Sequence, residues 1–176
     1  MTMGILVGAA LLVSMASGCG APDGPPLETL TATDVTGLPA GNALGSRFAG
    51  QYLTTEATIT ACRCRVGSCS VLRLYIGNTT QFVQKDGALT YTVSNGSTDS
   101  STGAGGVDDD GKFWTGSVAQ APEVTVYSLV NGTFELAGGV PTSAACVSDA
   151  TITGVIADTN LDCDLRSSVS LRYEGP

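Results

Sequence analysis

Residues 51–62 read Gln-Tyr-Leu-Thr-Thr-Glu-Ala-Thr-Ile-Thr-Ala-Cys, and their polarity alternates along the chain. Leu53, Ala57 and Ile59 fall on one parity, whereas Glu56 lies between threonines on the other. Successive side chains of a strand point to opposite faces, so this pattern predicts a β-strand with one buried and one solvated face. Such strands are typical of antiparallel sheets.

Three further stretches carry the same period of two. They are residues 70–76, 123–130 and 168–173. We count about nine or ten such strands between Ala49 and Tyr173. No window predicts a helix longer than a turn or two.

Short turn motifs separate the predicted strands. Asp86-Gly87, Asp110-Gly111 and Asn131-Gly132 share one form, and Asn95-Gly96 adds a fourth. Asp-Gly and Asn-Gly supply the positive φ angles that a two-residue hairpin needs. We expect residues 97–106, rich in Ser, Thr and Gly, to form a loop. The sequence therefore predicts an all-β, disulfide-stapled antiparallel meander. It would close as an up-and-down barrel or a barrel-like sandwich, because either closure hides strand edges.

The charge balance limits the possible partners. The 176 residues include 16 acidic and 8 basic side chains, which gives a net charge of −8, and there is no histidine. An acidic surface without a basic stripe repels phosphate backbones, so we expect no nucleic-acid partner.

An apolar stretch near the start of the chain ends at Ala16-Ser17-Gly18-Cys19. This segment resembles a bacterial lipoprotein signal, in which the cysteine is diacylated and becomes the mature N-terminus. The resemblance implies a signal peptide over residues 1–18 and a lipidated Cys19 on a flexible Pro/Gly-rich tether over residues 19–46. A single β domain would follow over residues 47–176. It also implies a bacterial cell envelope location with a lipid anchor in the membrane, and Gly20 favours the outer membrane. The alternatives are an ordinary cleaved signal peptide or a buried strand, with Cys19 in a disulfide.

The remaining cysteines number five if Cys19 carries lipid, and they are Cys62, Cys64, Cys69, Cys146 and Cys163. An odd number in an oxidising compartment predicts two disulfides and one free thiol. We expect one disulfide between Cys146 and Cys163, which bracket a predicted strand and its return. The other would join Cys69 to Cys62 or Cys64 across a short turn. The same cluster is a weak candidate for a zinc or redox site, since zinc sites have wider spacings and a fourth ligand.

The acidic run Asp108-Asp109-Asp110-Gly111 is a candidate cation loop, but its spacing does not match the EF-hand pattern, which favours a solvated turn. Asn78-Thr79-Thr80, Asn95-Gly96-Ser97 and Asn131-Gly132-Thr133 match glycosylation sequons, and we interpret them as turns.

Catalysis has little support in the sequence. Histidine, the usual base for a Ser or Cys nucleophile, is missing, and Lys85 and Lys112 both lie beside turns. Paired carboxylates for glycoside hydrolysis are conceivable at Glu56, Glu123 and Glu135, but a Glu in an alternating strand normally faces water. We expect no enzyme activity, no cofactor and no metal.

The leading functional hypothesis is therefore a lipid-anchored envelope protein that displays a non-catalytic β domain for a structural or protein-interaction role. The alternative is a carrier of an apolar small molecule or lipid. A closed meander of eight or more strands is similar in outline to the lipocalin-like barrels, which enclose such ligands. That likeness concerns the fold alone.

Overall fold

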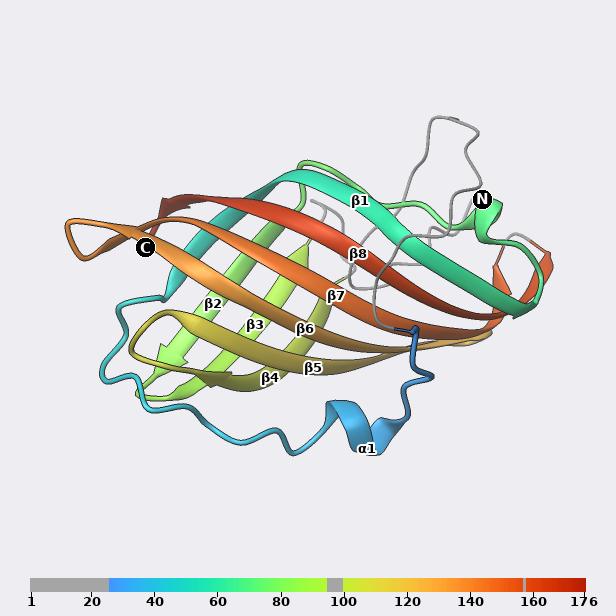
Figure 1. Cartoon of the computed structure of the whole chain (residues 1–176), viewed down its shortest axis with the longest axis horizontal. Coiled ribbons are helices and arrows are strands. Elements are labelled where there is room, and N and C mark those ends of the chain that lie inside the picture. The colour runs from blue at the N-terminus through green and yellow to red at the C-terminus, as the bar shows by residue number, and fades with distance from the viewer. Residues whose placement is uncertain (1–25, 95–99, 157) are drawn as a thin grey trace.

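The computed structural model describes residues 26–94, 100–156 and 158–176, which form a closed barrel of eight antiparallel strands (Figure 1). The strands are β1 (Gly50–Val66), β2 (Thr79–Lys85), β3 (Ala88–Ser94), β4 (Ser100–Val107), β5 (Lys112–Ala121), β6 (Val124–Ala137), β7 (Val140–Ile156) and β8 (Thr159–Gly175). Each strand pairs with its neighbour in sequence, and β8 pairs with β1. The predicted all-β, up-and-down barrel is confirmed. The described residues also form a one-turn helix α1 (Ala32–Val35) and a 3-10 turn η1 (Cys69–Val71).

The barrel has two unequal halves, because β2, β3 and β4 have only seven or eight residues whereas β1, β7 and β8 have 17 each. β1 pairs with β2 only over Gly50–Leu53, and β5 pairs with β4 only over Phe113–Gly116. One half therefore has eight strands, and the other has the five strands β5–β6–β7–β8–β1. The connection from β1 to β2 covers the open side of the second half, and its Leu72 is buried there.

In residues 51–62, even-numbered side chains face the interior at the start of β1, and odd-numbered ones face it further along. Tyr52 and Thr54 are buried at the start of β1, although the alternation favours Leu53. The register with β8 shifts between Thr54 and Glu56. A shift of one residue exchanges the two faces of the strand for all the residues that follow, because successive side chains point to opposite faces. Ala57 consequently lines the barrel interior.

The described part of the expected tether is not a free linker. Residues 26–49 are here called the strap. Its first part runs along the outside of the barrel (Figure 1), where Leu30 and Val35 are buried, and its last part packs Ala43 and Phe48 into the barrel core. Gly116 of β5 makes room for the strap, since a Cβ there would lie 2.1 Å from the Val35 carbonyl oxygen. The indole Nε1 of Trp114 donates a hydrogen bond of 2.9 Å to the Pro39 carbonyl oxygen. The expectation of a flexible tether is therefore wrong from residue 26 onward, because Leu30 and Val35 pack against the barrel.

Two of the turn predictions are confirmed, since Asp86-Gly87 joins β2 to β3 and Gly111 lies between β4 and β5. Asn131-Gly132 is instead in the middle of β6. A Cβ at Gly132 would lie 2.5 Å from the Phe113 ring, so this glycine accommodates an aromatic side chain and does not make a turn. Asn95-Gly96 lies outside the described residues.

Other sequence boundaries also differ from the structure. The described residues form eight strands where nine or ten were expected, partly because residues 70–76 belong to the end of η1 and an irregular connection. The expected loop over residues 97–106 is strand β4 from Ser100 onward. Its glycines allow close packing, since a Cβ at Gly103 would lie 2.3 Å from the Tyr91 ring.

Candidate functional site

The barrel interior contains two separate apolar clusters. The first fills the eight-stranded half with aromatic rings, of which Phe113 and Phe134 have centroids 4.6 Å apart. The second lies in the five-stranded half around Ile152 and Leu165. Both clusters consist of side chains that pack against one another.

A cavity lies beside the first cluster, on its side toward the second. Along β7, Cys146 and Ser148 line the cavity, whereas Ala150 and Ile152 belong to the second cluster. The space open to the centre of a water molecule is about 70 Å³, and the whole hollow with its open mouth is about 620 Å³. One water occupies a probe sphere of roughly 10–15 Å³, so the cavity has room for more than one water or for a compact molecule about the size of one substituted ring.

The walls of this cavity are mainly apolar. They include four residues of the first cluster, together with aliphatic side chains from several strands; these are Phe82, Tyr91, Phe113, Leu171, Ala57, Leu74, Val93, Val130 and Val169. None of the described lining residues is charged. The lining also includes Tyr75, which is 37% exposed and belongs to the connection between β1 and β2.

Five polar side chains also line the cavity. Four are Thr54, Asn78, Thr80 and Ser148, which are each 4–7% exposed. No side-chain hydrogen bond joins any of these four to another residue in the described part of the chain. The fifth, Thr115, is fully buried, and its Oγ1 has no partner among the described residues. Buried polar groups are normally hydrogen-bonded, so this set marks the cavity as a place for a further molecule, either water or a ligand.

The sequence does not place Asn78 and Thr80 in the barrel interior, because their motif is typical of a turn. Thr80 belongs to β2, and Asn78 immediately precedes it. Both stand on the same parity as Phe82, which is the signal that could have placed them inside the barrel. The other two sequons fare differently, since Asn131 lies in β6 and Asn95 is outside the described residues.

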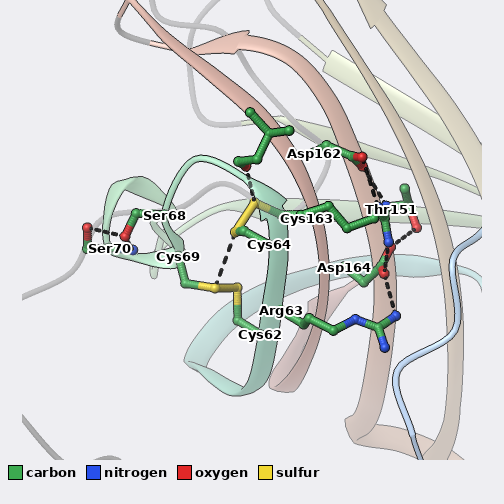
Figure 2. Close-up of a disulfide and its surroundings, with 12 residues drawn as sticks. Cys62, Arg63, Cys64, Ser68, Cys69, Ser70, Thr151, Asp162, Cys163 and Asp164 are labelled. Atoms are coloured by element: carbon green, nitrogen blue, oxygen red, sulfur yellow. Dashed lines mark hydrogen bonds and ion pairs between the residues drawn. A yellow bond between two sulfur atoms is a disulfide. The ribbon is translucent and has the colours of Figure 1, made fainter.

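The cysteines form two disulfides at the end of the five-stranded half, as Figure 2 shows. The turn disulfide joins Cys62 to Cys69, as one of the two expected pairings predicts. The closing disulfide joins Cys64 of β1 to Cys163 of β8, which face each other directly in the ladder. Among the five described cysteines, these two disulfides leave Cys146 free, which is the expected number of bridges and free thiols.

The expected disulfide between Cys146 and Cys163 is wrong. In the β7–β8 ladder Cys146 pairs with Val169, whereas Cys163 pairs with Ile152. The two cysteines are therefore six residues apart along the ladder, roughly 20 Å at the usual rise per residue. Cys146 remains free and lines the cavity. Burial raises the pKa of its thiol to about 12, so the thiol is neutral at physiological pH.

The three clustered cysteines bring their sulfur atoms within 4.8 Å of one another. All three sulfurs are in disulfides, however, and a metal site needs thiolates. In this oxidised state the cluster has no ligand to offer a metal.

The other sequence candidates lie apart from the cavity. In the acidic run, Asp110 forms an ion pair of 2.7 Å with Lys112, which lowers the pKa of the carboxyl group, and Asp108 accepts a hydrogen bond from the backbone of the strap. Lys85 is exposed at the end of β2. Glu56, Glu123 and Glu135 are all exposed, and none lines the cavity. No arrangement of these residues suggests a catalytic site within the described part of the chain.

An ionic cluster on the outer wall holds the strap near the disulfides. The carboxylate of Asp164 is fully buried and accepts hydrogen bonds from Arg63, Arg65, Thr29 and Thr151. Burial by itself would raise the pKa of this carboxyl group, but these donors outweigh burial and lower the pKa to about 2. The arrangement of Arg63, Thr151 and Asp164 beside the closing disulfide is seen in Figure 2.

Comparisons of the chain with models of protein families, with curated proteins and with solved structures gave no match. Among the described residues, no helix is both long and apolar enough to cross a membrane.

Proposed function

We propose that this protein binds one small, mainly apolar molecule in the cavity of its barrel. The observation that carries the proposal is the cavity between two packed clusters, with mainly apolar walls, the exposed Tyr75 in its lining and no charged side chain among its described lining residues. Small-molecule sites are typically concave and apolar with a few polar groups. The small volume favours a compact ring-sized ligand over a long acyl chain.

We further propose that the barrel is exported and anchored to the bacterial cell envelope through lipid on Cys19. Two disulfides support an oxidising compartment, because structural disulfides are rare where thiols are kept reduced. Intact-mass measurement of protein from the envelope tests this part, and an unmodified Cys19 would refute the anchor.

The rival role is display of the domain to a protein partner, which needs a continuous exposed apolar patch. Large exposed apolar side chains are spread over separate elements, such as Val83 of β2, Val147 of β7 and Ile76 of the connection before β2. The cavity is therefore the stronger basis for a function.

Titration of the full chain with toluene, followed by NMR, tests the proposal. At about 0.7 kcal/mol per non-hydrogen atom, inside the known range for very small ligands, seven atoms correspond to a Kd of roughly 0.3 mM. Ala57→Leu places a larger side chain in the cavity wall and should weaken binding at least tenfold. Ala145→Leu makes the same change at an exposed position of β7 and should leave the Kd unchanged. Equal effects of the two variants, or no saturable binding to the unaltered protein, would count against the proposal.

A further inference from the structure

The polar residues of the cavity define the chemistry of its ligand, and this step rests on the proposed function. We infer that the ligand is a neutral, ring-sized molecule with a hydrogen-bonding group, such as a cyclic alcohol, phenol or amide, and that Asn78 is the residue that selects this group. Thr54 and Thr80 stand beside Asn78 and complete the polar end of the cavity.

The three residues meet where β1 and β2 separate. The backbone N–H of Thr54 donates to the carbonyl oxygen of Asn78 at 2.8 Å, and Gly77 donates to the carbonyl oxygen of Thr54 at 2.9 Å. These bonds fix the backbone on either side of the split. The side chains of Thr54, Asn78 and Thr80 line the cavity at this point.

Asn78 offers the largest number of hydrogen-bonding groups at this end of the cavity. Its side chain is 5% exposed and lines the cavity, and its amide makes no hydrogen bond to any other described residue. An amide offers two N–H donors and one oxygen acceptor. Leaving such a group unpaired in a buried site is costly, so an occupant that both donates and accepts hydrogen bonds is favoured there.

The remaining walls select an apolar body without charge. Phe82, Phe113 and Val169 surround the rest of the space, and aromatic faces pack well against a flat ring. A charged group in this cavity would lack a counter-ion among the described lining residues, and an anion would also meet a protein of net charge −8.

Toluene and phenol form a matched pair of probes, because they share a ring and differ by a methyl or a hydroxyl group. We expect the ratio of the two dissociation constants to shift about tenfold toward toluene in Asn78→Leu, since the variant leaves the phenol hydroxyl unpaired. Thr80→Val is isosteric and should shift the ratio severalfold in the same direction. Thr79→Val changes the neighbouring position, which does not line the cavity, and should leave the ratio unchanged. Benzoate, which is anionic, should bind at least tenfold more weakly than phenol.

The possible outcomes separate the two proposals. If ordered water alone occupies the polar end, the ratio of the toluene and phenol dissociation constants should stay within twofold of the original in both Asn78→Leu and Thr80→Val. That result would overturn this inference but leave toluene binding intact. Benzoate binding as tight as phenol overturns the requirement for neutrality. Failure of both toluene and phenol to bind the unaltered protein refutes the cavity function itself. Should Asn78→Leu fail to fold, Thr80→Val carries the test.

Discussion

Replacing Asp164 by asparagine removes the charge that fastens the strap to the outer wall. Its carboxylate is fully buried and accepts hydrogen bonds from Arg65 at 2.6 Å, Arg63 and Thr151 at 2.8 Å and Thr29 at 3.0 Å. Asparagine has nearly the same shape, but its NH₂ group would face donors. The variant therefore leaves Arg63 without its carboxylate, leaves Arg65 with Asp162 alone, and leaves at least one donor without an acceptor.

The expected loss of stability follows from this geometry. Removing one partner of a buried ion pair costs about 3–5 kcal/mol, and the partly exposed guanidinium groups place this site at the lower end, about 3 kcal/mol. At roughly 2–4 °C per kcal/mol for a domain of this size, the melting temperature should fall by about 6–12 °C. The control is Asp162→Asn, whose partner Arg65 and own carboxylate are both partly exposed, and it should cost no more than about 1 kcal/mol.

The pH dependence provides a second measure of the same contact. Because the pKa of Asp164 is lowered in the folded state, its contribution is present above about pH 4 and is lost as the pH falls toward 2. The shift from 3.8 to about 2 corresponds to about 2 kcal/mol. The Asp164→Asn variant should lack this part of the acid dependence.

Urea unfolding followed by the fluorescence of Trp114, the single tryptophan, measures these differences. The indole is suited to the purpose because it contacts the strap. A loss below 1 kcal/mol for Asp164→Asn, or a loss equal to that of Asp162→Asn, would refute the role given to the buried carboxylate.

Three further predictions concern the strap, the disulfides and the free thiol. Gly116→Val should lift the strap, because a Cβ there would lie 2.1 Å from a strap carbonyl oxygen, and limited proteolysis should then cut the strap faster than in the unaltered protein. Replacing both cysteines of the closing disulfide by serine should lower the free energy of unfolding by about 4.7 kcal/mol, and the same change in the turn disulfide by about 2.5 kcal/mol. The difference arises because the sequence separations are 99 and 7 residues. Equal losses in urea unfolding would contradict the loop-entropy account. Cys146, with its pKa raised to about 12, should react with a thiol reagent at pH 8 on the order of a thousandfold more slowly in the folded than in the unfolded protein, and similar rates would show that the thiol is not buried.

The sequence predicts the class of this fold well because alternation is a local property. The run in residues 51–62 and the Asp86-Gly87 turn identify strands and a hairpin without any tertiary information. Closure is also predictable, since an open meander would expose its edges. The parity of β1 is not predictable, because the shift of register after Thr54 depends on the partner strand β8.

The errors at glycines and cysteines have a common physical origin. Gly132 has the composition of a turn, but it lies in a strand because the Phe113 ring occupies the space of its Cβ. Cys146 and Cys163 are close in sequence, yet the register of two long strands separates them and brings Cys64 opposite Cys163. Both outcomes depend on contacts across the sheet, which spacing along the chain does not contain.

The candidate site was the least predictable part of the molecule. A cavity is the space that side chains from six or more strands leave unfilled, and a single strand's pattern does not reveal it. Asn78 illustrates the difficulty, because a buried asparagine at a strand end has the same sequence signature as an exposed one in a turn.

A crystal structure of the protein under xenon pressure tests the cavity most directly, because xenon enters dry apolar cavities and is visible by its scattering. We predict a xenon atom between the two clusters, in contact with Val130 and Val169, while the rest of the barrel remains unchanged. An interior filled by the side chains of Phe82 and Phe113, with no xenon between the clusters, would contradict the account.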